Sequence, residues 1–359
     1  TPIKSSAASD VYKRQALSQQ NNKRIAKNTL LLYFCMLFSM GIGLFTSRIV
    51  LESLGIEDYG IYNLVGGIVT IFAFLNSAMI ATSQRFISYE LGKGNLHKLK
   101  DVFCTTLTIH IAIAFIIVVL SEVIGVWFLN TKLNIPSDRM MAANWTLQLS
   151  IFVFAVNVIS VPYNASIVAH EKMSAFAYIS IFEVSLKLAI AYLLLFISYD
   201  KLIVYSILVF CVALLLRSLY CFYCKRHFEE CHYTFSFNIE QFREMFAFAG
   251  WSLVGNLGFS FKDQLSNILL NLFFGTVVNA ARGISVQVGS LINSFSANFM
   301  MAMNPQITKS YAVGDLYRSK ELVYAGCRFS FYLLAVISLP IMINITYICL
   351  LYTSPEPTR

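Results

Sequence analysis

The chain has 359 residues, of which 57% are hydrophobic and 13% are charged, with a mean hydropathy of +0.65 and a formal net charge of +8. A water-soluble domain carries about 25% charged residues, so this composition excludes a water-soluble fold and indicates an all-α polytopic membrane protein. The relevant count is therefore the number of membrane spans, each of which needs about 20 apolar residues.

The two ends of the chain lack the apolar pattern of the rest. Residues 1–15 and 351–359 resemble translated sequencing-adapter sequence, so we leave them out of the fold prediction. We expect residues 1–21 to be a non-native or disordered extension and residues 351–359 to be a non-native tail. We also expect the natural protein to continue beyond residue 350.

Apolar runs separated by charged or turn-rich breaks predict about nine transmembrane helices. In chain order they cover residues 28–50, 59–81, 102–129, 142–168, 174–197, 202–222, 246–271, 277–303 and 323–350. Residues 22–224 would form a complete first lobe of six helices, and residues 225–245 a cytoplasmic linker. Residues 246–350 would then hold the first three helices of a truncated second lobe.

The distribution of Lys and Arg predicts the orientation. With the N-terminus in the cytoplasm, the outer breaks keep only Lys132, Arg139 and Lys201, whereas the cytoplasmic breaks hold most of the remaining cations. Because cytoplasmic loops of membrane proteins carry an excess of Lys and Arg, we predict that the N-terminus is cytoplasmic.

A polar loop occurs twice in this pattern. Residues 84–101 (QRFISYELGKGNLHKLKD) return as residues 306–321 (QITKSYAVGDLYRSKE), with Gly92 matched to Gly314 and Leu96 to Leu316 across a two-residue gap. Both copies follow a pair of apolar segments, and six predicted spans separate them. An even number of spans gives the two halves the same topology, as in transporters whose repeats are related by an axis along the membrane normal.

Two charged residues lie four positions apart in the fifth predicted span. Glu183 precedes Lys187, which is the favourable order for an i,i+4 ion pair on a helix. Because a charge near the bilayer centre costs about 2.5–3.5 kcal/mol, the pair should face the interior of the bundle. It could be a structural link between helices, or it could form a cavity wall or a proton-sensitive gate.

Further charges lie in the other predicted spans. Lys262 and Asp263 are adjacent, so their side chains diverge by about 100° and at least one faces a cavity or another helix. Arg48 ends the first span, and Arg282 lies in the eighth. Converging cations suit an anionic ligand such as a lipid pyrophosphate, since Arg binds phosphate bidentately and Lys acts as a point charge.

Other residue patterns give little support for catalysis or for a metal site. The run Cys221, Cys224, His227, Cys231 and His232 has a spacing that could bind zinc, but a packing role for these residues is the better interpretation. The sequence has no nucleotide-binding loop, no nucleophile elbow and no HExxH motif. We therefore predict no catalytic residue, no metal and no cofactor, and nothing indicates nucleic-acid binding.

Three stretches of the chain resemble bacterial polysaccharide flippases. They are residues 46–62 (TSRIVLESLGIEDYGIY), residues 162–173 (PYNASIVAHEKM) followed by Glu183 and Lys187, and residues 279–284 (NAARGI) followed by 304–315 (NPQITKSYAVGD). The resemblance runs from about residue 22 to residue 350. It is to the multidrug/oligosaccharidyl-lipid/polysaccharide exporter superfamily, and within it to flippases of O-antigen or capsule repeat units.

This resemblance implies two six-helix lobes around a cavity that opens alternately to the two sides of the bacterial inner membrane. It also implies transfer of undecaprenyl-pyrophosphate-linked oligosaccharide to the outer leaflet for lipopolysaccharide or capsule synthesis. Possible partners are membrane lipids, a polysaccharide polymerase and glycosyltransferases.

The expected substrate-binding cations are Arg48, Lys187, Lys262 and Arg282, and Glu183 or Asp263 would couple transport to a proton or sodium ion. A cation-coupled multidrug exporter of the same superfamily and a non-transporting scaffold of a polysaccharide synthesis complex remain open alternatives.

Overall fold

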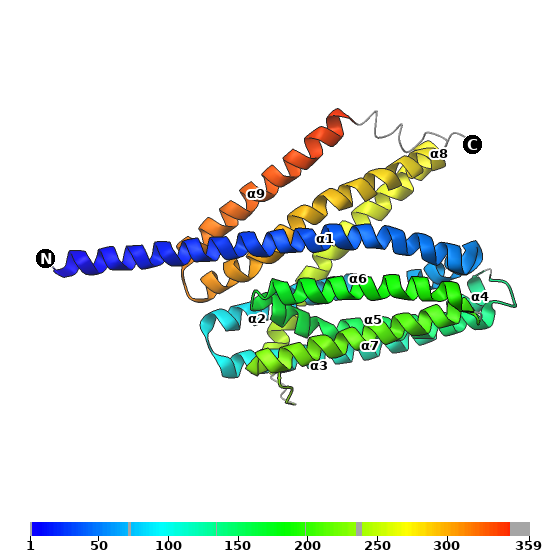
Figure 1. Cartoon of the computed structure of the whole chain (residues 1–359), viewed down its shortest axis with the longest axis horizontal. Helices are drawn as coiled ribbons and strands as arrows, with labels where there is room; N and C mark the ends of the chain where they lie inside the picture. Colours follow the sequence, from blue (N-terminus) through cyan, green and yellow to red (C-terminus); the bar gives the residue numbers. More distant parts are fainter. Residues whose placement is uncertain (1, 71–72, 134, 198, 235–238, 345–359) are drawn as a thin grey trace. The chain divides into compact units, whose positions relative to one another are not determined.

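The structure is a computed structural model, and it describes residues 2–70, 73–133, 135–197, 199–234 and 239–344. Every regular element within these ranges is helical, which confirms the predicted all-α fold. In chain order (Figure 1) the long elements are α1 (Pro2–Thr70), α2 (Ala73–Lys93), α3 (Leu96–Leu120), α5 (Met140–Ala169), α6 (Met173–Phe196), α7 (Lys201–His227), α8 (Ile239–Ala312) and α9 (Leu316–Ile343). The short elements are the π-helix η1 (Ser121–Gly125), α4 (Val126–Lys132) and the 3-10 helix η2 (Glu229–Cys231).

Six helical segments within the described residues are long and apolar enough to cross a membrane. They are Asn22–Gly67, Leu96–Lys132, Met140–Ala169, Met173–Phe196, Lys201–His227 and Leu316–Ile343. The predicted span 59–81 is divided between α1 and α2, and α8 covers both predicted spans 246–271 and 277–303. The polytopic helical architecture is therefore the predicted one, although the labels α1 and α8 each run across two predicted spans.

By internal contacts the chain separates into two compact units. Unit 1 consists of residues 1–29 and 260–359, and unit 2 consists of residues 30–259. The division into a first lobe (22–224), a linker (225–245) and a second lobe (246–350) rests on the sequence repeat and stays a prediction.

The core of unit 2 is built around α5. Among the most apolar 18 residues of each helix, 61% are buried in α5, compared with 17% in α6 and 28% in α7. Helix α5 is therefore the central helix. Phe103 of α3 is fully buried and packs edge-to-face on Tyr163 of α5, with 5.4 Å between ring centroids. Large apolar side chains such as Phe115 and Phe196 remain exposed on the outside, as expected for a surface in contact with lipid.

Helix α1 is interrupted at Gly55. This residue has φ 79° and ψ 169°, a conformation that is essentially restricted to glycine. A Cβ at this position would meet no atom within 4 Å, so the backbone conformation alone requires glycine here. The break predicted at residues 55–58 is thus present: two helical segments meet at the non-helical Gly55.

The two copies of the repeated loop form equivalent turns. Gly94 and Gly314 both have positive φ, at 71° and 80°, and each precedes a helix N-cap. The Asn95 side chain accepts a hydrogen bond from the Lys98 backbone N–H at 3.1 Å, and Asp315 accepts one from Arg318 at 3.0 Å. Gly94 is therefore the structural counterpart of Gly314, and the predicted match of Gly92 to Gly314 is wrong by two residues.

An ion cluster joins three elements of unit 2 at the start of α5. The Arg139 Nε donates to Asp58 Oδ1 at 2.8 Å, and its Nη1 donates to Asp200 Oδ2 at 2.8 Å. Asp58 follows the α1 kink, Arg139 is the N-cap residue of α5, and Asp200 caps α7 through the Leu202 and Ile203 backbone N–H groups. Hydrogen bonds to the two carboxylates outweigh burial and raise the pKa of Arg139 above its ordinary value.

In unit 1 the start of α9 packs against the end of α8. Gly326 lies so close to α8 that a Cβ would come within 3.3 Å of the Met300 Sδ. Phe299 of α8 and Phe329 of α9 pack edge-to-face, with 6.1 Å between ring centroids. The small residue brings the two helices together, and this contact shapes the pocket considered below.

Candidate functional site

The charged pair of α6 forms as its spacing suggests. The Lys187 Nζ donates to the Glu183 Oε1 at 2.6 Å, and the two side chains are 45% and 33% exposed. The pair is thus formed on one face of the helix and remains accessible.

A tyrosine pair and a small cavity lie elsewhere in unit 2. Tyr62 of α1 packs edge-to-face on Tyr205 of α7, with 4.9 Å between ring centroids. Tyr62 also lines a cavity of about 160 Å³ between α1, α5 and α7, together with Asn157 and Ser206. Although its lining is largely apolar, these polar groups could hold water molecules in a cavity of this size. It was not predicted, because its lining residues are far apart in the sequence.

Arg48 is exposed on α1, about two turns before the kink. Among the described residues it has no hydrogen-bond or ion-pair partner. A cation in an apolar span is costly where it faces lipid. Such an arginine is stabilised by facing water, lipid headgroups or an anionic ligand.

The remaining predicted site residues lie on α8. Lys262 is exposed and Arg282 is half-buried, and each takes part in a polar or electrostatic contact. Both belong to unit 1, whereas Arg48, Glu183 and Lys187 belong to unit 2, so a site that they share stays a prediction. The side chain of Asp263 lies outside the described residues.

The sequence analysis missed an arginine within the sixth predicted span. Arg217 of α7 lies over the ring of Tyr163 at 5.8 Å, and its Nη1 is buried without a hydrogen-bond partner among the described residues. A buried guanidinium nitrogen without a partner is energetically costly, which makes this residue a functional candidate. Its position inside an apolar run was visible in the sequence and would have been enough to single it out.

The Cys- and His-containing segment at the end of α7 and in η2 is tightly packed. The Cys224 Sγ donates to the Tyr163 carbonyl oxygen at 3.5 Å, and both Cys224 and Cys231 are fully buried. Nearby, the His170 Nε2 lies 2.6 Å from the Glu230 Oε1, and the His170 ring stacks on Phe228. Within the described ranges no group of three or more His, Cys, Asp or Glu side chains could hold a metal ion.

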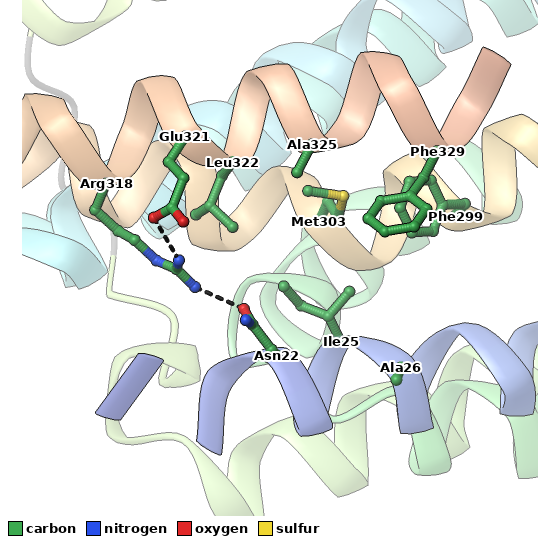
Figure 2. A pocket seen from close by; sticks show the side chains of 10 residues that line it. All are labelled: Asn22, Ile25, Ala26, Phe299, Met303, Arg318, Glu321, Leu322, Ala325 and Phe329. Carbon is green, nitrogen blue, oxygen red and sulfur yellow. Dashed lines mark hydrogen bonds and ion pairs between the residues drawn. The ribbon is translucent and has the colours of Figure 1, made fainter. Parts of the chain in front are cut away.

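A second, larger pocket lies in unit 1 (Figure 2). It has a volume of about 360 Å³ and is enclosed by the start of α1, the end of α8 and the start of α9. At one end the Arg318 Nη1 donates to Glu321 Oε2 at 2.8 Å and its Nη2 donates to Asn22 Oδ1 at 2.7 Å. The other end is closed by the Phe299 and Phe329 rings. None of these residues was predicted as part of a site.

Residues 25–308 match the protein family described as polysaccharide biosynthesis protein. The chain belongs to this family. The match covers most of the sequence and includes all the predicted site residues.

Other similarities agree in fold. The chain is 19% identical over 285 residues to the uncharacterized membrane protein EpsK of Bacillus subtilis, covering 78% of this chain and 55% of that protein. It thus spans about half the length of this curated relative.

Solved transporter structures resemble the chain at a TM-score of 0.75 or more. An outward-facing multidrug resistance MATE transporter of the MOP superfamily has a TM-score of 0.79 at 13% identity, over 93% of this chain and 74% of its own. The MATE transporter VcmN of Vibrio cholerae, in its bent form, has a TM-score of 0.78 at 15% identity, over 94% and 77%. A MOP-superfamily transporter of Pyrococcus furiosus has a TM-score of 0.75 at 14% identity, over 94% and 75%. The chain therefore has the fold of MOP-superfamily transporters.

Proposed function

We propose that this protein moves a lipid-linked oligosaccharide, carried on undecaprenyl pyrophosphate, across the bacterial inner membrane by alternating access. Its N-terminus lies in the cytoplasm in this proposal, and the glycan passes to the outer leaflet for lipopolysaccharide or capsule synthesis. Membership of the polysaccharide biosynthesis family and the MOP-superfamily fold support this function. Glycosyltransferases would supply the glycan, and a polymerase would consume it.

The observation that carries the proposal is the unpaired cation in the first membrane helix. Arg48 lies within the apolar segment Asn22–Gly67 and has no carboxylate partner among the described residues. A pyrophosphate would supply an anionic partner for this guanidinium. The planar fork of arginine suits bidentate phosphate binding. Lys187 is already neutralised by Glu183, so it contributes less net charge than Arg48 does.

The predicted cations Lys262 and Arg282 complete the proposed substrate site from the second lobe, and Glu183 or Asp263 would couple transport to a proton or sodium gradient. Removing the charge of Lys262 or Arg282 should therefore weaken substrate binding more than it lowers the stability of the fold.

The test is a lipid-linked oligosaccharide flipping assay with the full-length protein in liposomes, using the variants Arg48→Gln and Arg48→Lys. Losing one charge-assisted bidentate contact should lower the flipping rate by about tenfold or more, with partial retention in the Lys variant. In cells, surface polysaccharide should fall in Arg48→Gln and Lys262→Gln. Unchanged surface polysaccharide in both variants would refute the assignment of these residues to the substrate cavity.

A cation-coupled drug exporter is the second candidate, because MATE transporters share the fold. Such a protein needs carboxylates to bind cationic drugs, so Arg48→Gln should leave drug export unchanged or improve it. Export of cationic drugs by the unmodified protein, without any glycan flipping, would favour this alternative. Purified protein that moves neither substrate would favour a scaffold role.

A further inference from the structure

The unit 1 pocket is polar at one end and apolar at the other. Arg318, Glu321 and Asn22 gather at one end, whereas Met303, Phe299 and Phe329 lie at the opposite end (Figure 2). Arg318 and Phe329 are separated by 11 residues on α9, which corresponds to about 16 Å along the helix. The hydropathy of α9 changes in the same direction, because Arg318 and Glu321 precede the apolar span that was predicted to begin at residue 323, whereas Phe329 lies within it.

From this hydropathy we infer that the polar end is at the membrane boundary and that the aromatic end is within the apolar layer. A molecule that fills the pocket must have a polar head and a hydrocarbon tail. The volume of about 360 Å³ falls at the lower end of the range for ligand pockets. It is large enough for a headgroup and the first part of a chain.

The charges around the polar end favour an anionic head. The chain segments that form it, residues 22–27 and 316–322, hold five cations and one carboxylate; these are Lys23, Arg24, Lys27, Arg318, Lys320 and Glu321. The Arg318 side chain is only 14% exposed and its two hydrogen bonds use two of the five N–H donors that a guanidinium carries. The remaining donors can bind a phosphate.

Glu321 is the group that an incoming anion must displace. Its side chain is 55% exposed, and its ion pair with Arg318 is an i,i+3 contact at the helix surface. Exposed ion pairs of this kind contribute little to stability. The carboxylate can therefore turn into solvent at small cost, leaving Arg318 to the ligand.

We propose that this pocket binds the phosphate headgroup of an anionic lipid, with Arg318 as the phosphate-binding residue and Glu321 as its internal competitor. The assignment of this end to the cytoplasmic leaflet rests on the proposed function and orientation. The binding itself does not depend on transport. The lipid could be a bilayer phosphatidylglycerol or an undecaprenyl phosphate, since both carry a phosphate on a hydrocarbon chain.

The test is native mass spectrometry of the purified full chain with phosphatidylglycerol, phosphatidylcholine or undecaprenyl phosphate, without any transport assay. Arg318→Gln should lower the bound fraction of the anionic lipids by about tenfold, because a charge-assisted contact is lost. Glu321→Gln should raise it by several-fold, which no folding defect can imitate. The control Arg328→Gln, on the same helix outside this pocket, should match the unmodified protein.

Preferential binding of phosphatidylglycerol or of undecaprenyl phosphate supports the proposal and identifies the source of the phosphate. Displacement of the lipid by millimolar inorganic phosphate supports headgroup recognition by Arg318. Equal binding of phosphatidylcholine, equal losses in Arg318→Gln and Arg328→Gln, or no gain in Glu321→Gln would overturn it. Normal glycan flipping by an Arg318→Gln variant that no longer binds lipid would leave the proposed function intact.

Discussion

Replacing Arg139 by Gln should destabilise unit 2 more than any other single charge removal near the start of α5. The guanidinium lies between Asp58 and Asp200, and the three side chains are 23%, 15% and 32% exposed. Breaking a fully buried pair costs about 3–5 kcal/mol, whereas an exposed pair contributes about 0–1 kcal/mol. Because these exposures are intermediate, Arg139→Gln should lower the free energy of unfolding by about 2–3 kcal/mol.

The consequence is a lower melting temperature. At about 2 °C per kcal/mol for a domain of this size, Arg139→Gln should melt about 4–6 °C lower in detergent. Trp127 and Trp145 lie near this end of unit 2, so their fluorescence reports the transition. Asp58→Asn should cost about half as much, because Arg139 keeps its contact with Asp200.

A double-mutant cycle separates this cluster from a general effect of charge. In Asp58→Asn with Arg139→Gln, the repulsion between Asp58 and Asp200 is also removed, so the double variant should lose less than the sum of the singles. The control is Lys201→Gln at the same end, which should melt within about 1 °C of the unmodified protein. Strictly additive losses of stability, or an Arg139→Gln shift in melting temperature no larger than that of the control, would refute the stabilising role of this ion cluster.

Three further predictions concern unit 2, each measured by melting temperature in detergent. Gly55→Ala should cost about 1–3 kcal/mol through its positive φ, whereas Gly60→Ala, at a helical position, should be neutral or stabilising; equal effects would contradict the strain argument. Glu183→Gln should lower stability by leaving Lys187 unpaired, and the double variant with Lys187→Gln should recover part of the loss. No recovery would mean that the pair is not coupled. Arg217→Met should not lower stability, because it removes a buried nitrogen that has no partner among the described residues; a drop of more than about 5 °C would indicate a contact that stabilises the fold.

The sequence predicted the features that depend on short-range spacing. Hydropathy located the apolar helices, and the i,i+4 order of Glu183 and Lys187 predicted a contact that the structure contains. The repeated loop predicted two equivalent turns. The matching glycine was misidentified, although Gly94-Asn95-Leu96 and Gly314-Asp315-Leu316 align without a gap, and the positive φ of both glycines identifies the equivalent pair.

The sequence could not predict contacts between distant segments. Arg139 lies 81 residues from Asp58 and 61 from Asp200, and only the packing of α1, α5 and α7 brings them together. For the same reason the pocket around Arg318, which includes a residue 296 positions away, was not foreseen.

The main buried cluster of unit 2 draws all its residues from positions 87 to 231, from Ile87 at one extreme to Cys231 at the other. Once Cys231 has left the ribosome, every side chain of that cluster has therefore been synthesised. Bacterial translation at roughly 5–20 residues per second needs about 6–26 s for the remaining part of this chain. This buried cluster can thus complete its packing before α9 is made.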